Sequence, residues 1–184
     1  MIAHKTKRYT VEEFDEFIYL PENVDKEFEF IGGEILEVVS NSYSSEIAAT
    51  ISAEIRMYIK GKKLGRVTGA DGGYIIAGER YIPDVAFISI KKQPLSSREA
   101  YNPNPPDLVV EVVSPSDSNR QMKIKVANYM AVGAIVWVVY PETHDVEVFR
   151  SAQAVQILGI DDTLAGGDIL PGFTLPVKEI FPKE

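Results

Sequence analysis

The sequence predicts an α/β domain built around a mixed β-sheet with helices on its faces. Isoleucine recurs at every fourth position from residue 47 to residue 59, which is the spacing of a buried helix face. Apolar segments at 108–113 and 134–140 enclose a helical segment, and this order is typical of a right-handed crossover between parallel strands. Shorter apolar segments bounded by glycine, proline and asparagine supply the remaining strands.

Two elements are predicted before this core. Thr10 and Glu13 have the spacing of a capping box, which predicts a short helix that ends near Pro21. The hairpin expected next turns at Gly32-Gly33 and has two strands, Phe28–Ile31 and Glu34–Val39.

A long helix opens the predicted core, which spans residues 44–140. Ser44 or Ser45 can cap this helix, and Gly61 with Gly65 ends it. Its isoleucine stripe must be buried, because a row of apolar side chains is stable only against another apolar surface. The strands expected after the helix lie at 66–68, 74–77, 82–90 and 108–113.

A second helix and two C-terminal strands complete the domain. Asp117 or Ser118 opens the helix, which runs to Ala131 and stops at Gly133. The apolar strand 134–140 follows this helix. Strand segments near 146–149 and 154–158 then form a hairpin that is added to the core.

The composition predicts one soluble globular domain over residues 1–184, because 45% of the residues are apolar. The absence of cysteine excludes disulfides and thiolate sites for zinc or iron–sulfur clusters. Residues 1–8 carry charge without an apolar stretch behind them, and we expect them to be disordered. The longest apolar run, 131–140, is too short to span a membrane, so we expect a cytoplasmic protein.

The net charge of −8 argues against a protein whose whole surface binds nucleic acid, because phosphate contacts need a positive field. Two stretches nevertheless contain basic residues and no acid. The first holds Arg56, Lys60, Lys62, Lys63 and Arg66, and the second holds Arg120, Lys123 and Lys125. Each can be an ordinary solvated helix face, and the first is also a candidate for contacts with a nucleic-acid backbone.

A single carboxylate interrupts the apolar strand 108–113. Glu111 lies where the centre of a sheet is expected, and a charge there costs several kcal/mol unless another group pairs with it. With a period of two, Glu111 shares its face of the strand with Val109 and Val113. One interpretation is an ion pair with a nearby lysine or arginine, and the other is a metal ligand.

A second carboxylate stands at the start of the preceding strand, where Pro83-Asp84 leads into an apolar segment. Acids at the ends of two neighbouring strands can chelate one hard cation through oxygen, which suits Mg²⁺ or Mn²⁺. Such a cation activates a water molecule and screens phosphate charge. Asp84 and Glu111 together therefore indicate metal-assisted hydrolysis of phosphodiester bonds.

Five short motifs follow one another through most of the chain: Phe28–Ile35, Ile82–Phe87, Pro106–Ser116, Lys125–Tyr129 and Trp137–Pro141. In this order and spacing they resemble the Uma-two putative restriction-endonuclease family, which belongs to the PD-(D/E)xK nuclease superfamily. The resemblance runs from about Tyr9 to Phe181. It implies a restriction-endonuclease-like core of a helix, three strands, a helix and a strand, with Mg²⁺-dependent cleavage of DNA by a homodimer.

The resemblance also implies roles for individual residues. The aspartate of the family's Pro-Asp pair falls on Asp84 and the strand glutamate falls on Glu111, and both would be metal ligands. The carbonyl oxygen of Val112 is a further candidate ligand. Glu29 matches the acidic residue of the family's N-terminal hairpin and is a third candidate acid. The family often has a histidine before its first long helix, and this chain has Ser44 at that place.

The catalytic lysine is displaced from its superfamily position. In the superfamily a lysine stands two residues after the strand glutamate, where this chain has Val113. The Uma-two family instead has a lysine four residues before a tyrosine on the next helix, and that position is Lys125. Helical spacing places Lys125 at one edge of the apolar stripe and Lys123 at the opposite edge, so geometry alone does not choose between them.

Two functions from different classes follow from these features. The first is a metal-dependent endonuclease that cleaves double-stranded DNA, with the stretch from Arg56 to Arg66 on the phosphate backbone. Lys125 would then orient the attacking water or help to deprotonate it. The alternative is a non-catalytic dimeric binding module derived from a nuclease, which the acidic charge and the missing in-strand lysine favour.

Overall fold

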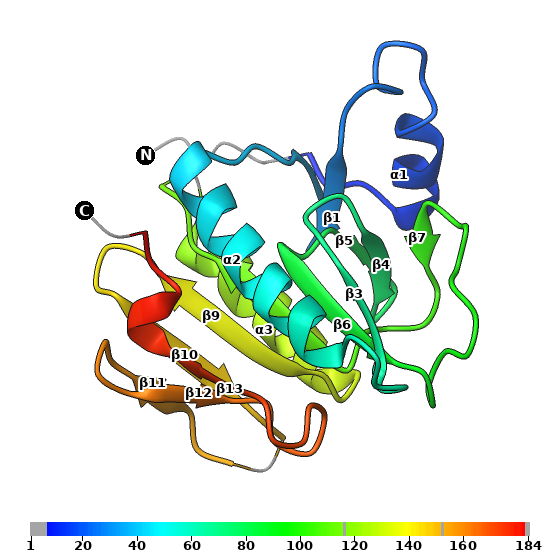
Figure 1. The fold of residues 1–184 in the computed structure, drawn as a ribbon. Helices are drawn as coiled ribbons and strands as arrows, with labels where there is room; N and C mark the ends of the chain where they lie inside the picture. The colour runs from blue at the N-terminus through cyan, green and yellow to red at the C-terminus, as the bar shows by residue number, and fades with distance from the viewer. Residues whose placement is uncertain (1–6, 116, 152, 183–184) are drawn as a thin grey trace.

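The centre of the protein is a six-stranded sheet with the strand order β11-β10-β9-β8-β6-β3 (Figure 1). We describe it from a computed structural model that covers residues 7–115, 117–151 and 153–182. β8 and β9 are parallel and the other neighbouring pairs are antiparallel, so the sheet is mixed as predicted. The strands are β3 (Gly65–Thr68), β6 (Val85–Ser89), β8 (Leu108–Val112), β9 (Ile135–Tyr140), β10 (Asp145–Phe149) and β11 (Gln156–Leu158).

Two long helices cover opposite faces of this sheet. α2 (Ser42–Ile59) packs on the face that carries Val110 and Val112. α3 (Asn119–Ala131) packs on the other face, which carries Val109 and Glu111. β8, α3 and β9 thus make the predicted strand, helix and parallel strand, because α3 carries the chain between two neighbouring strands.

The cap of α2 differs from the prediction. Asn41, rather than Ser44 or Ser45, caps this helix, and its side-chain oxygen accepts a hydrogen bond from the Ser44 N–H at 2.9 Å. The helix begins earlier than predicted because this asparagine satisfies an N–H group of the first turn. Ser118 caps α3 as predicted and accepts a hydrogen bond from the Gln121 N–H.

The N-terminal hairpin and three strands from residues 73–102 form a second sheet with the order β2-β1-β5-β4-β7. The predicted hairpin supplies β1 and β2, and its turn holds Gly32 at φ 57° and Gly33 at φ 83°, a backbone region that glycine adopts without steric cost. α1 (Val11–Phe17) has the predicted capping box and packs Phe14 on this sheet. The strands are β1 (Phe28–Ile31), β2 (Glu34–Glu37), β4 (Gly73–Ile76), β5 (Glu79–Tyr81) and β7 (Tyr101–Asn102).

The predicted strand 82–90 is wrong in its first part. β5 ends at Tyr81 in the smaller sheet, and β6 of the main sheet begins only at Val85. Pro83 lies between them and has no N–H group to donate to a strand ladder. Residues 82–84 therefore carry the chain from one sheet to the other, and Asp84 lies at the junction of the two sheets.

The C-terminal part contains more structure than predicted. β10 and β11 form the expected hairpin, although β11 begins at Gln156. β12 (Thr163–Ala165) then pairs with β13 (Thr174–Pro176), and the 3₁₀ helix η1 (Val177–Glu179) follows. These elements escaped the sequence analysis because three-residue strands between turns have no measurable periodicity.

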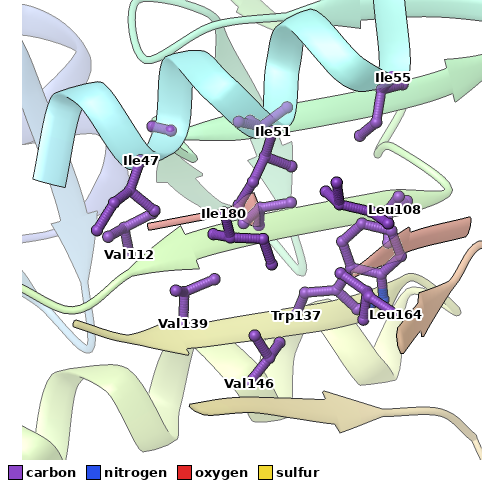
Figure 2. Close-up of a cluster of buried hydrophobic side chains, with 14 of the residues drawn as sticks. Ile47, Ile51, Ile55, Leu108, Val112, Trp137, Val139, Val146, Leu164 and Ile180 are labelled. Carbon is purple, nitrogen blue, oxygen red and sulfur yellow. The ribbon is translucent and has the colours of Figure 1, made fainter. Parts of the chain in front are cut away.

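The isoleucine stripe of α2 is buried as predicted. Figure 2 shows Ile47, Ile51 and Ile55 directed from the helix toward β8 and β9. Each of the three is 0% exposed, and Leu164 and Ile180 from the C-terminal part close the same cluster. The C-terminal elements are therefore part of the main core.

Two predictions about the chain as a whole can be compared with the structure. None of the helices in the described ranges is long and apolar enough to cross a membrane. Disorder is predicted for residues 1–8, and residues 1–6 of this segment lie outside the residues that the structure describes. Lys7 and Arg8 are described, and Arg8 Nη1 donates a hydrogen bond to the Gly32 carbonyl at 2.8 Å.

Replacing Ile51 with alanine should lower the free energy of unfolding by about 2–5 kcal/mol, because the change removes buried methyl groups and leaves a cavity. Urea unfolding followed by circular dichroism measures this change. Met57 is the control, because it lies on the same helix with 68% of its surface exposed. Met57→Ala should change the stability by no more than about 0.5 kcal/mol. Equal effects of the two substitutions would contradict the packing described for α2.

Candidate active site

The candidate acids and the candidate lysine line one pocket of about 220 Å³ between the two sheets and α3. Glu29 comes from β1, Asp84 from the junction segment, Glu111 from β8 and Lys125 from α3. Val112 also lines the pocket. The structure thus brings together every residue that the sequence analysis named as catalytic or metal-binding.

The position of the pocket follows from the alternation of side chains between the two faces of β8. Glu111 points to the α3 side of the main sheet, whereas the side chains of Val110 and Val112 point to α2. On α3, Lys125 and Tyr129 are one turn apart and are the buried residues of the helix. Both of them therefore meet Glu111.

Lys125 connects two buried carboxylates. Its Nζ atom donates to Glu111 Oε2 at 2.7 Å and to Glu29 Oε1 and Oε2 at 3.0 and 3.2 Å. The exposed fraction is 7% for Lys125, 8% for Glu29 and 4% for Glu111. The ion pair predicted as one interpretation of Glu111 is therefore confirmed, and the same carboxylate also lines the pocket in which the metal-ligand interpretation places it.

The prediction that Lys125 lies at the edge of the apolar stripe is wrong. Lys125 is buried, because its ammonium group pairs with the carboxylates of Glu29 and Glu111 between α3 and the two sheets. Lys123 is exposed on the same helix. The structure therefore separates two lysines that helical spacing alone did not separate.

Tyr129 binds the second oxygen of the Glu111 carboxylate. Its hydroxyl donates to Glu111 Oε1 at 2.6 Å, and the tyrosine is 0% exposed. Burial and the neighbouring Glu111 raise the pKa of Tyr129 well above its ordinary value, so the hydroxyl stays protonated and remains a donor. Lys125 and Tyr129 together fix the orientation of the Glu111 carboxylate.

Asp84 lies beside this cluster and is held by the backbone of β8. Its Oδ2 atom accepts a hydrogen bond from the Val112 N–H at 2.6 Å. Burial raises the pKa of Asp84 from 3.8 to about 6, although the Val112 N–H and Lys125 lower it in part. The carboxylate of Asp84 is therefore easier to protonate than that of an exposed aspartate.

The charge of the pocket is unbalanced. Burial raises the pKa of Glu111, and Lys125 offsets only part of this effect. Burial acts to lower the pKa of Lys125, but Glu111 and Glu29 outweigh it and raise that pKa above its ordinary value. The ammonium group is therefore charged at neutral pH, and it faces three carboxylates, those of Glu29, Asp84 and Glu111.

A hydrogen-bond network behind the pocket was not found from the sequence. Glu79 of β5 accepts from the Gly32 N–H at 2.6 Å, from Asn128 Nδ2 at 2.9 Å and from the Tyr81 hydroxyl. Asn128 lies on α3 and its Nδ2 also donates to Tyr81 at 2.6 Å. The network ties α3 to the smaller sheet next to Lys125. No local pattern marks these residues, because they meet only when the two sheets are in place.

The first basic stretch lies outside the pocket. Arg56, Lys60, Lys62 and Lys63 are exposed at the C-terminal part of α2 and just after it. Lys62 Nζ lies over the Tyr58 ring, 3.2 Å from its centroid. Arg66 Nη1 donates to the Gln93 carbonyl at 2.6 Å and its Nη2 donates to the Pro94 carbonyl.

A known protein family matches most of the chain. The model of the Uma2 (Uma-two) family, described as putative restriction endonuclease, matches residues 11–178. The chain belongs to the Uma2 family. The resemblance predicted from the five short motifs is therefore confirmed. A search of curated proteins finds no match.

The fold of this Uma2 chain is also similar to a solved structure. That structure is a putative nuclease belonging to DUF820 from Anabaena variabilis ATCC 29413. The TM-score is 0.79 at 20% sequence identity, and the match covers 91% of this chain and 96% of the other. The similarity confirms the predicted fold class.

Replacing Tyr129 with phenylalanine should destabilise this Uma2 chain by about 1.5–3 kcal/mol, because the buried Glu111 carboxylate loses a donor. Tyr140→Phe is a matched control, since it removes a hydrogen bond to the half-buried Glu147. The control should cost less than about 1 kcal/mol. Urea unfolding at neutral pH compares the two variants. Similar costs would show that the Tyr129 hydroxyl does not support Glu111.

Replacing Asp84 with asparagine should make the metal-free Uma2 chain more stable above pH 6, where the wild-type carboxylate must ionise in a buried place. Because the folded pKa is raised from 3.8 to about 6, the wild type loses stability as pH rises through this window. The Asp84→Asn variant does not lose stability in this way, and its advantage over the wild type should be roughly 3 kcal/mol above the window and vanish below it.

Urea unfolding in EDTA across this pH range tests the effect. Asp161→Asn is the control, because Asp161 is exposed and the substitution makes the same chemical change outside the pocket. An advantage of Asp84→Asn that is the same at every pH would contradict the raised pKa.

Proposed function

We propose that this chain is a metal-dependent endonuclease that cleaves phosphodiester bonds in double-stranded DNA. Family and fold suggest a restriction-endonuclease-like nuclease. The observation that carries the finer proposal is the convergence of Asp84, Glu111, Glu29 and Lys125 on one pocket. Carboxylates that can hold a hard cation beside a buried ammonium group suit the chemistry of phosphate esters.

The residues present fit Mg²⁺ or Mn²⁺. Asp84 and Glu111 offer carboxylate oxygens, the Val112 carbonyl is the third candidate, and Mg²⁺ commonly uses one or two carboxylates with water in the other positions. The described residues contain no group of three or more acidic, histidine or cysteine side chains arranged for a metal. Water or substrate oxygens would complete the ligand set of a cation held by Asp84 and Glu111. Burial raises the pKa values of Asp84 and Glu111, so a bound cation would stabilise the ionised form of both carboxylates.

When bound, the cation would lower the pKa of a water molecule and neutralise charge on the phosphate. The residues of the chain would position the cation. Asp84, held by the Val112 N–H, and Glu111, held by Tyr129 and Lys125, present oxygens in fixed positions. Preorganised groups of this kind need no rearrangement during the reaction.

Lys125 acts as a fixed positive charge. Its raised pKa keeps the ammonium group protonated, which favours orienting the attacking water and offsetting phosphate charge over accepting a proton. Glu29 holds this ammonium group from the side of the smaller sheet. Glu29 is therefore assigned as a residue that positions Lys125.

The first basic stretch is assigned to the DNA backbone. Arg56 lines a groove of about 500 Å³ along α2, and Asp84 lines the same groove. A DNA strand that is held by the exposed lysines after α2 could thus follow this groove to the pocket that contains Asp84. Arg66 contributes less to this surface, because its guanidinium group is bound to backbone carbonyls. Such contacts position DNA without reading its sequence.

The second candidate function is a non-catalytic dimeric binding module. Val113 at the usual place of the lysine favours it, as does the net charge of −8. Homodimer formation and a cytoplasmic location stay predictions. A cleavage assay separates the two functions, because only the nuclease needs a divalent cation to convert its substrate.

Wild-type protein should nick and linearise supercoiled plasmid with Mg²⁺ or Mn²⁺, and EDTA should stop the reaction. Lys125→Met alone would leave two buried carboxylates unpaired, which costs about 3–5 kcal/mol. We therefore compare Glu29→Gln/Lys125→Met with Glu29→Gln, since the double variant removes one negative and one positive charge together. The double variant should be slower by about 10²-fold.

Lys123→Met is the control on the same helix, because Lys123 is exposed, and it should change the rate little. Circular dichroism and the midpoint of thermal unfolding verify that each variant is folded. Full activity in Glu29→Gln/Lys125→Met would remove Lys125 from the mechanism. A wild type that is inactive with either cation would favour the binding module.

Binding to duplex DNA should weaken steeply with added salt, because counterion release supplies most of the affinity. Lys62→Glu/Lys63→Glu should weaken binding similarly for unrelated sequences, as measured by fluorescence anisotropy in EDTA. Lys91→Glu/Lys178→Glu makes the same charge change at other exposed lysines and is the control. Unchanged affinity in the first variant would place DNA elsewhere, with the stretch from Arg120 to Lys125 next.

A further inference from the structure

A second cleft of about 460 Å³ adjoins the candidate active site. Ser114 and Asp117 line both hollows, so the two are neighbours. The second cleft lies beyond the C-terminal ends of the parallel strands β8 and β9, next to the first turn of α2. None of the catalytic assignments above uses this cleft.

The walls of the second cleft suit a flat and uncharged ligand. Tyr43, with 40% of its surface exposed, and Tyr140 supply aromatic rings, and Val113 and Pro141 supply apolar surface. Neither lysine nor arginine lines the cleft among the described residues, whereas Asp117 and Glu142 bring two carboxyl groups. A phosphate group would be repelled here, because it would meet negative charge without a compensating cation.

A buried hydroxyl also lines the cleft. Ser44 is only 3% exposed and lines the cleft from the first turn of α2. The cleft thus combines aromatic surface, two carboxyl groups and a buried serine.

We propose that the second cleft binds one nucleobase of the nucleic-acid substrate, next to the phosphate that is cleaved, and prefers bases that carry an exocyclic amino group. The proposal rests on the proposed function and adds a source of base preference to it. A base can stack on the Tyr43 ring, as bases do on aromatic residues in single-strand binding sites. The amino groups of adenine, cytosine and guanine donate to carboxylates, whereas thymine has no such group.

Binding of short single-stranded oligonucleotides in EDTA tests the proposal, because no cleavage occurs and the base need not leave a duplex. The probes are a fluorescein-labelled oligothymidine and the same strand with one central cytosine, adenine or guanine. Anisotropy should show that each amino-bearing strand binds about five-fold or more tightly than oligothymidine. Asp117→Asn/Glu142→Gln should remove this preference, since an amide can donate to thymine as well as accept.

Tyr43→Ala should weaken binding of all four strands by about five-fold or more, because the stacking surface is lost. The control is Tyr19→Ala, at an exposed tyrosine just after α1. Equal affinity for all four strands, equal effects of Tyr43→Ala and Tyr19→Ala, or no binding of any strand would each overturn the proposed subsite.

Plasmid cleavage by the same preparation distinguishes this failure from that of the proposed function. If the wild type still cleaves plasmid in Mn²⁺ after one of these results, only the subsite is wrong. If it neither cleaves plasmid nor binds the strands, the nuclease assignment is wrong and the subsite with it.

Discussion

The buried ammonium group of Lys125, placed between Glu29 and Glu111, is the interaction on which the rest of the structure depends. Each of the three residues comes from a different element, and the two acids belong to different sheets. Burying ions costs several kcal/mol each, and their attraction offsets this cost only when the hydrogen-bond geometry is good and few polar atoms are left over. Here the remaining Glu111 oxygen is bound by Tyr129, so the cluster is closely satisfied on that side.

This requirement explains why the two sheets meet where they do. The chain passes from β5 to β6 through Pro83, which has no N–H group to donate to the ladder of either sheet, and this break places Asp84 beside the cluster. The Ile82 N–H in the same segment donates to Glu29 Oε1 at 2.7 Å. The junction is thus tied to the acid that holds Lys125, and the network of Glu79, Tyr81 and Asn128 braces α3 from behind.

The same cluster has an excess of negative charge, which is consistent with the proposed binding of a divalent cation. Three carboxylates face one ammonium group in a small pocket, and burial makes the ionised form of Asp84 and Glu111 unfavourable. A divalent cation is the simplest way to restore the balance, and it would also let an acidic protein approach a phosphate. Carboxylates line the pocket, and exposed basic residues lie at the far end of α2.

Periodicity and punctuation in the sequence were sufficient to predict the main sheet, both long helices and the strand carboxylate Glu111, because a buried stripe or strand leaves a repeating local pattern. The short motifs were sufficient for the family and for the set of candidate acids. Long-range packing decided the rest. Lys125 and Lys123 look alike on a helical projection, and only the positions of Glu29 and Glu111 in space draw one of them inward. The break at Pro83, the C-terminal strands and the Glu79 network also depend on partners far away in the chain, and a contact between distant residues leaves no periodic signal in either segment.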